Sequence, residues 1–146
     1  GGGDNINQIR FSKNNFPVFK IITNKIKNNR KFLIYGKDPK NNQTAIRDYI
    51  HALDIANIIK QSILHLIKNK KNLILNCSNE KPTTIEELIR VFAKISKKKI
   101  NYQIVKKRVG EDFVFYGDNK KLNKTFNFKL KYNLKRIIKD SYESIY

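Results

Sequence analysis

Apolar residues recur with a period of about 3.6 along several stretches of the chain, which is typical of helices with one buried face. The first stretch runs from Phe16 to Ile26, and Pro17 fits its first turn because that turn leaves backbone N–H groups unused. The strongest periodicity follows Asp54, a candidate N-cap, and comprises Ile55, Ile58, Ile59, Ile63, Leu66 and Ile67. The pattern predicts two amphipathic helices in the first half of the chain.

Polar side chains that can cap a helix precede the remaining periodic stretches. Thr84 and Glu87 have the spacing of a capping box, and the stripe that follows them is Ile85, Leu88, Ile89 and Phe92. Asp118 is a candidate cap for a short helix through Leu122. Asn133 is a candidate cap for a last helix, with inward residues Leu134, Ile137, Ile138, Tyr142 and Ile145.

Short apolar runs without helical period lie between these helices and predict strands. Residues 32–35 form one run, closed by Gly36, and residues 102–105 form another. The run from Leu73 to Leu75 is continuous, as expected of a strand buried on both faces. Because helices and strands alternate, we expect one α/β unit over residues 16–146, preceded by a leader or truncated junction at residues 1–15.

The composition adds a large positive charge to this pattern. The 146 residues include 31 Lys and Arg against 12 Asp and Glu, which gives a formal charge of +19. A basic surface can bind nucleic acid by releasing counterions from phosphates. However, 25 of the basic residues are Lys, whereas base recognition prefers Arg, and Lys, Asn and Ile together supply 66 residues. These three residues share A/T-rich codons, so we favour biased genome composition over a nucleic-acid surface.

Several classes of protein are disfavoured by what the sequence lacks. No window approaches the roughly 18 apolar residues of a membrane span, and the N-terminal residues have no signal-peptide pattern. One cysteine allows no internal disulfide, and two histidines are too few for a tetrahedral zinc site. We therefore expect a cytoplasmic protein without a metal. The chain contains no Met, so we expect it to be processed, to carry an engineered start or to be a piece of something longer.

Two segments carry arginines that stand out against the lysines. Arg47, in residues 44–51, suits a bidentate contact with phosphate oxygens, and pairing with Asp48 or Asp54 is an equally good interpretation. In residues 106–112, Arg108 precedes a glycine that lets the backbone approach a ligand, and a carboxylate follows that can accept from sugar hydroxyls. A solvated turn is the alternative for this second segment.

Other polar residues have less specific surroundings. Residues 76–80 follow the predicted buried strand, a place where open α/β folds hold ligands. We expect Cys77 to be a small buried residue and His51 to be packed or hydrogen-bonded, since neither has the partners of a catalyst. The chain has no dinucleotide glycine fingerprint and no phosphate loop. The nearest match to a catalytic Tyr-x-x-x-Lys motif, Tyr116 with Lys120, is expected to begin in a loop.

Four segments of the chain resemble four motifs of one protein family, in the same order and at about the same spacing. Residues 34–38 resemble the motif I-F-G-x-D, and residues 47–56 are close to R-D-Y-I-H-V-x-D-L-A. Asn76 matches the start of N-L-G-x-G, and residues 108–111 are close to R-x-G-D. On these residues the chain resembles the C-terminal part of a UDP-glucose 4-epimerase, in the extended short-chain dehydrogenase/reductase superfamily.

The resemblance implies a fold and a reaction. It implies a mixed α/β substrate-binding domain plus elements that join a Rossmann sheet, with the NAD-binding Rossmann domain and the catalytic residues outside the chain. NAD takes hydride from C4 of a UDP-sugar in this family and returns it to the other face. We therefore expect an isolated fragment to be inactive and the full-length enzyme to be a homodimer. The helix after Asp54 and the strand at Leu73 are expected to expose apolar surface without the rest of the sheet.

The resemblance also assigns substrate contacts. It implies that Arg47 and Arg108 hold the diphosphate, that Tyr35 lies beside the uracil and ribose, and that Tyr49 lines the pocket. Glu111, at a position usually occupied by Asp, is expected to accept from ribose hydroxyls.

Three positions bear on the choice of sugar and of reaction. Phe115 matches a residue that controls room for an N-acetyl group, which favours glucose and galactose, and ordinary core packing is the alternative. Ser78 and Glu80 replace glycines of the family motif, which affects the expected uridine pocket. A related nucleotide-sugar dehydratase or decarboxylase and a basic nucleic-acid-binding module remain the competing functions.

Overall fold

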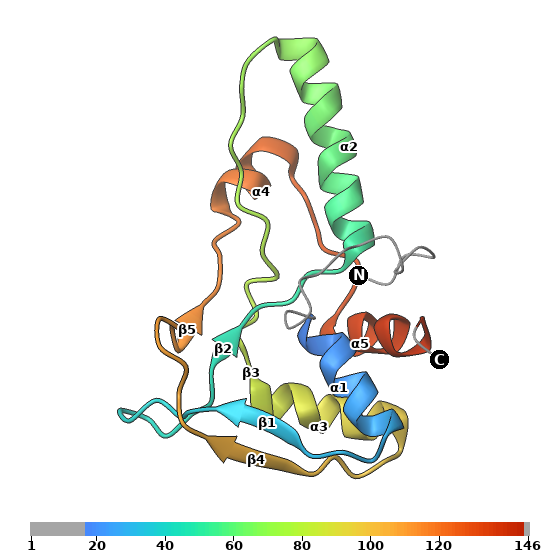
Figure 1. Cartoon of the computed structure of the whole chain (residues 1–146). Helices are drawn as coiled ribbons and strands as arrows, with labels where there is room; N and C mark the ends of the chain where they lie inside the picture. The colour runs from blue at the N-terminus through green and yellow to red at the C-terminus, as the bar shows by residue number, and fades with distance from the viewer. Residues whose placement is uncertain (1–16, 145–146) are drawn as a thin grey trace.

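The computed structural model describes residues 17–144. The predicted leader, the helix start at Phe16 and the inward Ile145 lie outside the described residues. Within them the chain forms helices interspersed with short strands (Figure 1), which confirms the α/β prediction. The elements are α1 (Val18–Lys27), β1 (Phe32–Tyr35), β2 (Ile46–Arg47), α2 (Ala52–Asn69), β3 (Thr83–Thr84), α3 (Ile85–Ser96), β4 (Tyr102–Val105), β5 (Val114–Phe115), α4 (Lys120–Phe126) and α5 (Leu134–Glu143).

Three helices and one pair of strands form the main core. β1 and β4 pair in parallel, with Phe32 opposite Tyr102 and Tyr35 opposite Val105. Helices α1, α3 and α5 pack together over this pair (Figure 1). The buried residues of this main core are Ile22, Ile26, Phe32, Ile34, Leu88, Ile89, Phe92, Ile100 and Ile138. They include apolar positions that the helical period and the run at residues 32–35 had placed inward.

A second, smaller sheet brings together three distant segments. β2 is its central strand, antiparallel to β3 and parallel to β5, so that Arg47 lies opposite both Thr83 and Phe115. Each of its strands has only two residues. Strands this short carry no alternation of apolar and polar residues that a sequence could reveal.

Helix α2 has a partner on only one side. It extends away from the main core, beside α4 (Figure 1). A second core of Ile58, Leu122 and Phe128 holds one face of the helix. The apolar residues left exposed on it are Leu53, Ile59, Ile63, Leu64, Leu66 and Ile67. This confirms the expected apolar surface. None of the helices in the described part is long and apolar enough to cross a membrane.

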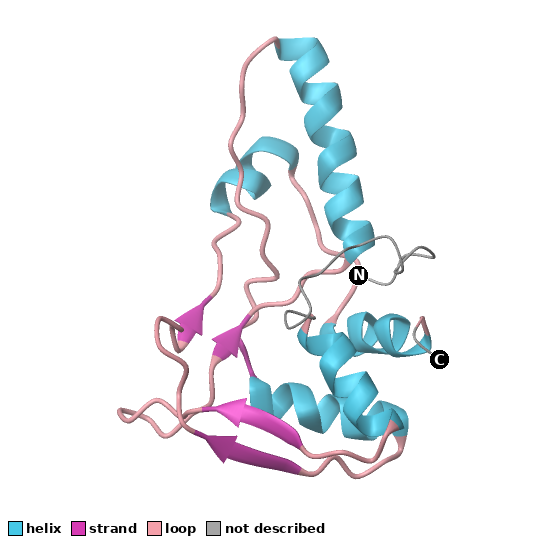
Figure 2. Cartoon of the chain, viewed as in Figure 1, coloured by secondary structure: helices cyan, strands magenta, loops and turns pink. Residues whose placement is uncertain are grey.

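The predicted strand at Leu73–Leu75 is wrong. Residues 71–79 belong to no helix or strand, and Figure 2 shows them as an extended loop beside α2. Ile74 is 82% exposed. A run of apolar residues becomes a buried strand only when other strands pair with it, and no described strand lies alongside.

The helix caps agree with the sequence at two sites and differ at two. Thr84 and Glu87 form the predicted capping box of α3, and the Asn133 side chain accepts from the Arg136 N–H at the start of α5. Asp54 does not cap α2, because the cap is His51, whose ring nitrogen accepts from the Leu53 N–H. At α4 the cap position is Asn119, whose side chain makes no cap bond, while the carboxylate of Asp118 accepts from the Lys120 N–H at 2.6 Å.

Candidate functional site

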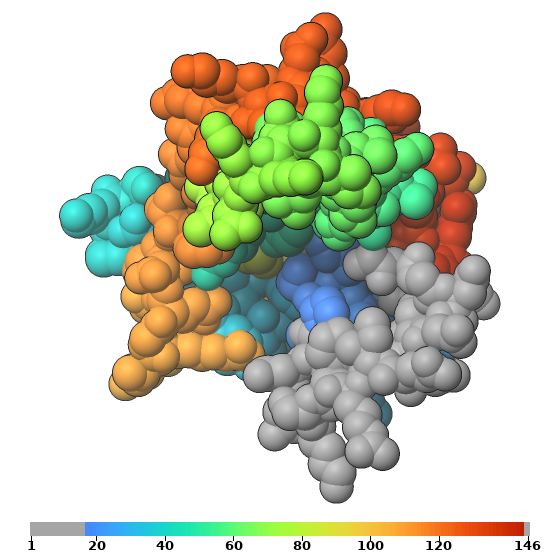
Figure 3. Space-filling model, turned by 90° about the horizontal axis from the view of Figure 1, so that it is seen from above, coloured from blue at the N-terminus to red at the C-terminus, as the bar shows by residue number. Residues whose placement is uncertain are grey.

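A cavity of about 410 Å³ lies between α1, β1, β2 and the segment that joins β4 to β5. We call residues 106–113 of this segment the strap. Five of the six residues predicted from the sequence line the cavity, and these are Tyr35, Arg47, Tyr49, Arg108 and Glu111. In Figure 3 the surface is hollowed between α1 in blue and the orange region that contains the strap. The fold thus brings together residues up to 76 positions apart in the sequence.

Phe115 is the predicted residue that the fold does not bring to this cavity. It lies on β5, opposite Arg47 in the parallel register, and is 69% exposed. It is therefore neither in the main core nor among the residues that line the cavity. β5 is an edge strand, and no described layer covers the side to which Phe115 turns. The exposure of Phe115 contradicts core packing, and its role in controlling room for an N-acetyl group stays a prediction.

Arg47 is held by the strap. Its guanidinium donates to the carbonyl oxygens of Ile46 at 2.7 Å, Asp112 at 2.8 Å and Phe113 at 3.3 Å. Its Nη2 atom also lies 3.6 Å from Oε1 of Glu111. The expected ion pair with Asp48 or Asp54 is absent from the described contacts, because both carboxylates are engaged elsewhere.

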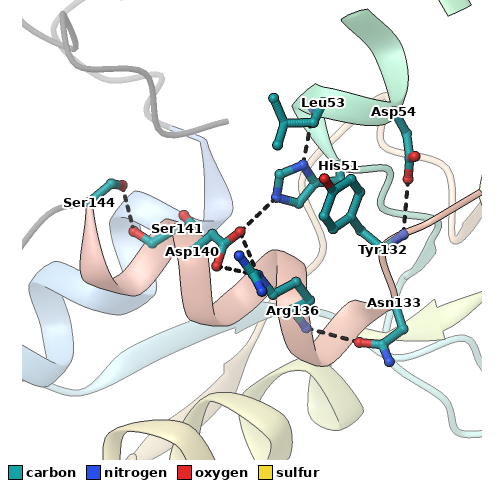
Figure 4. Close-up of polar contacts among 9 residues, drawn as sticks. All are labelled: His51, Leu53, Asp54, Tyr132, Asn133, Arg136, Asp140, Ser141 and Ser144. Atoms are coloured by element: carbon teal, nitrogen blue, oxygen red, sulfur yellow. Dashed lines mark hydrogen bonds and ion pairs between the residues drawn. The ribbon is translucent and has the colours of Figure 1, made fainter. Parts of the chain in front are cut away.

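Asp48 and Asp54 each join two segments of the chain. Asp48 accepts from the hydroxyl of Ser78 and from the Asn79 N–H at 3.2 Å. Asp54 is buried and accepts from the N–H groups of Lys131 at 3.1 Å and Tyr132 at 3.3 Å (Figure 4). These carboxylates therefore stabilise the fold around the site.

Arg108 covers the aromatic ring at the end of β1. Its guanidinium carbon lies 3.6 Å from the ring centroid of Tyr35, which is a cation–π contact. The strap approaches β1 closely next to this contact: a Cβ atom on Gly36, which has a φ of +80°, would lie 2.9 Å from Cβ of Lys107. Glycine at this position thus allows the strap to place Arg108 over Tyr35.

Two polar atoms of residues that line the cavity are buried without a hydrogen-bond partner, Oη of Tyr49 and Oε2 of Glu111. Burial raises the pKa of Tyr49 to about 12, with Arg47 opposing this and Asp48 adding to it. The phenol therefore stays protonated at neutral pH and can donate, while the Glu111 oxygen can only accept as a carboxylate. Buried polar atoms usually have partners, so the pair indicates a ligand with its own donors and acceptors.

The cavity also has residues that the sequence did not single out. Its apolar wall includes Val18, Ile21 and Ile85, and Lys25 adds a third cationic side chain. The helical period of α1 was visible, but a period does not show which face meets a cavity. Lys25 could not be distinguished from the other lysines.

The segment at residues 76–80 supports the site without lining the cavity. Ser78 and Asn119 are buried and exchange hydrogen bonds, and the Asn119 N–H donates to Glu80 at 2.8 Å. Glu80 has a φ of +51°, a conformation that favours glycine, at a position where the resembled motif has one. Cys77 is exposed, contrary to the prediction, because the segment that carries it is not a buried strand.

His51 has the structural role that was expected. Its Nδ1 accepts from the Leu53 N–H, so Nε2 carries the proton and donates to Asp140 at 3.1 Å (Figure 4). Its ring stacks on Tyr132 at 4.2 Å. Arg136 beside Asp140 holds the pKa of that carboxyl below its usual range, with His51 contributing. These contacts tie the start of α2 to α5.

Comparison with known proteins identifies relatives. No family model matches the chain. A UDP-glucose 4-epimerase from Cyamopsis tetragonoloba is 32% identical over 113 residues, which are 75% of this chain and 32% of that protein. The chain resembles UDP-glucose 4-epimerases over three quarters of its length. It spans about a third of the length of the curated epimerases that it matches.

Solved structures show the same fold. The UDP-glucose 4-epimerase of Brucella ovis, in complex with NAD, matches 85% of this chain and 39% of its own with a TM-score of 0.76 and 23% identity. A dTDP-glucose 4,6-dehydratase from Bacillus anthracis, also with NAD, matches 88% of this chain and 38% of its own with a TM-score of 0.71 and 14% identity. This chain therefore shares the fold of the matching part of an epimerase and of a dehydratase.

The described residues do not fit the NAD that these epimerase and dehydratase structures contain. Gly36 ends β1 but is followed by a loop, and no described strand is joined to a helix by a glycine-rich turn. Tyr116 is exposed, and Lys120 pairs with Asp118 at 3.0 Å as the first residue of α4. Tyr116 and Lys120 therefore do not share a helix, and we derive no hydride step within residues 17–144.

Proposed function

We propose that the cavity binds the UDP part of a nucleotide sugar, within an NAD-dependent 4-epimerase that interconverts UDP-glucose and UDP-galactose. The observation that carries the proposal is the convergence of Tyr35, Arg47, Tyr49, Arg108 and Glu111 on one cavity. Two arginines and an aromatic ring that line the same cavity match a diphosphate attached to a base, because guanidinium groups bind phosphate oxygens in pairs of hydrogen bonds. The similarity to UDP-glucose 4-epimerases supports this choice of nucleotide.

In this proposal each residue contacts a different part of the ligand. Arg108, which is exposed and has no carboxylate partner among the described ion pairs, moves from Tyr35 to the diphosphate. Tyr35 then contacts the base, and Arg47 holds the second phosphate. Oε2 of Glu111 accepts from a ribose hydroxyl, and the protonated Tyr49 donates to an acceptor on the ligand.

The proposed contribution of these residues to the reaction is binding and orientation. NAD supplies the hydride chemistry when it is bound, and the described residues do not hold it. Contacts with the nucleotide hold the sugar in one place, and binding energy from such unreactive parts lowers the barrier at the reacting carbon. We therefore expect residues 17–144 to bind the nucleotide without epimerase activity. We thus propose that residues 16–146 form one nucleotide-sugar-binding region.

A related dehydratase is the second candidate. The dTDP-glucose 4,6-dehydratase of Bacillus anthracis has the same fold, so the fold leaves both reactions open. The higher sequence identity to epimerases favours the first candidate. A cytoplasmic location and a homodimeric full-length enzyme are further predictions of the epimerase proposal. Nucleic-acid binding is the alternative that the charge alone suggests.

Calorimetric titration of the 146-residue chain with UDP, dTDP and polyuridylate tests the proposal. We expect saturable binding of UDP, weakened about tenfold or more by Arg108→Ala, because a charged hydrogen bond to phosphate is lost. Arg90→Ala is the matched control, since Arg90 is an exposed arginine on α3 outside the cavity. Preference for dTDP would favour the dehydratase. Binding of polyuridylate alone, with a steep dependence on salt, would show a nucleic-acid surface instead.

A further inference from the structure

The contacts of Arg47 differ in how easily a ligand can replace them. Its three bonds to backbone carbonyls are between 2.7 and 3.3 Å long, and the two to Asp112 and Phe113 fix the guanidinium to the strap. The contact with Oε1 of Glu111 is longer, at 3.6 Å, and joins side chains that are 25% and 34% exposed. Such a partly exposed ion pair is weak. The Glu111 carboxylate is therefore the neighbour of Arg47 that an incoming anion can displace.

Glu111 and a diphosphate require the same cation. Phosphate oxygens that bind Arg47 come to the side where the Glu111 carboxylate lies, and like charges in close contact disfavour each other. The partial exposure of Glu111 gives its carboxylate a path to water when it leaves Arg47. A neutral ligand has no phosphate to bind Arg47, so it does not displace the Glu111 carboxylate.

The strap is held in place by contacts that do not involve Glu111. Lys107 lies over the ring of Phe113 with Nζ 4.3 Å from the centroid, and the close approach of Gly36 to Lys107 fixes the other side. The backbone bonds from Arg47 to Asp112 and Phe113 also remain when Glu111 changes. Removing the charge of Glu111 should therefore leave the strap where it is.

We propose that Glu111 is an internal competitor for the phosphate site, because its carboxylate holds Arg47 until a nucleoside diphosphate displaces it. This inference rests on the proposed binding of a nucleotide. An anionic ligand binds only when Arg47 is free of Glu111, so the apparent affinity falls in proportion to the fraction of molecules in which Arg47 is free. Glu111 does not compete with the neutral nucleoside for Arg47, so it reduces the advantage that a diphosphate has over the nucleoside alone.

The test compares UDP with uridine in calorimetric titrations of the full 146-residue chain and of Glu111→Gln. Glutamine keeps an oxygen that can accept from a ribose hydroxyl and removes only the charge. We expect the dissociation constant of UDP to fall about threefold to tenfold in Glu111→Gln, whereas that of uridine, which has the ribose but no phosphate, should not fall. Glu143→Gln is the matched control, because it removes the same charge from a 3.8 Å ion pair with Lys139 on α5.

Each result decides the inference. Tighter UDP binding in Glu111→Gln but not in Glu143→Gln supports it, including the case in which only Glu111→Gln binds measurably. Unchanged or weaker UDP binding in Glu111→Gln overturns it and leaves the proposed function standing if the unmodified chain binds UDP. Failure of both chains to bind UDP overturns the proposed function as well. Should circular dichroism show Glu111→Gln to be misfolded, Glu111→Asp, with a shorter reach to Arg47, takes its place and must also tighten UDP binding.

Discussion

The main core and helix α2 begin from the same kind of sequence pattern and end in different surroundings. Helices α1, α3 and α5 place their apolar stripes against one another and against β1, so that Phe92 and Ile138 are fully buried. The apolar stripe of α2 is just as regular, yet Ile63 and Ile67 are 51% and 70% exposed. Helical period therefore predicts a helix and its apolar face, while burial of that face depends on partners from elsewhere in the sequence.

The same difference separates the two apolar runs that predicted strands. Residues 32–35 pair with β4, 70 positions later, and two of their side chains enter the main core. Residues 73–75 are also an unbroken apolar run but have no partner strand among the described residues, and they stay an extended loop. The strands that lie beside a segment in the fold, and not its hydrophobicity alone, decide whether it becomes a strand.

Truncating one side chain in each region should give the largest measurable difference in stability between the main core and α2. Phe92→Ala should lower the free energy of unfolding by about 3–5 kcal/mol, because it leaves a cavity in the main core. Ile63→Ala on α2 should cost less than about 1 kcal/mol, since half of the side chain is already in water. Urea denaturation followed by circular dichroism measures both. Equal losses would show that α2 is packed as tightly as the main core.

Two glycines in and beside the strap have similar backbone conformations but differ in how closely other atoms approach them. Gly36 and Gly110 have φ values of +80° and +78°, but only Gly36 has a neighbour, Cβ of Lys107, at 2.9 Å from an added Cβ. Gly110→Ala should cost about 1 kcal/mol from backbone strain alone. Gly36→Ala should cost about 1 kcal/mol more and weaken UDP binding. Thermal unfolding of the two variants gives the difference, and equal costs would contradict the close approach.

The exposed face of α2 predicts a change in dye binding with little change in stability. Replacing Ile59, Ile63 and Ile67 together by Gln should reduce the fluorescence of a bound hydrophobic dye and reduce aggregation, because the exposed apolar patch is smaller. The free energy of unfolding should fall by less than about 1 kcal/mol. Ile58→Gln is the control, since this buried neighbour should destabilise the chain. Dye binding that does not change would place the apolar patch elsewhere.

The smallest expected effect comes from the capping box of α3. The Thr84 backbone N–H donates to Glu87 and lowers the pKa of that carboxyl, with the Thr84 hydroxyl adding to it. A lowered pKa in the folded state means that the stabilisation is present above the ordinary carboxyl value of 4.5 and is lost as the pH falls below it. Unfolding curves between pH 6 and 3 should therefore converge for the unmodified chain and Glu87→Gln. A constant difference across that range would contradict the assignment.

Local signals in the sequence predicted local structure well. The capping box at Thr84 and the cap at Asn133 depend on residues within a few positions, and the structure has both of them. The two-residue strands β2, β3 and β5 are too short to leave a pattern. Asp54 shows the limit of a local signal, because its carboxylate binds backbone groups 77 and 78 positions away.

The candidate site was predictable as a set of residues but not as a geometry. Motif resemblance selected Tyr35, Arg47, Tyr49, Arg108 and Glu111, and the fold places all of them around one cavity. The pairing of Arg47 with Glu111 and the position of Arg108 over Tyr35 depend on how the strap folds back. The exposure of Phe115 depends on β5 being an edge strand. Spacing along the chain carries neither kind of information.

The most direct test of the account is a titration of the isotope-labelled chain with UDP, followed by amide chemical shifts. The account predicts saturable shifts at Tyr35, at residues 47–49 and along the strap, with none along the exposed face of α2. This result would place the ligand in the cavity that the fold assembles. Shifts spread over the lysine-rich surface, or no shifts at saturating UDP, would contradict the central claim that this cavity is a nucleotide site.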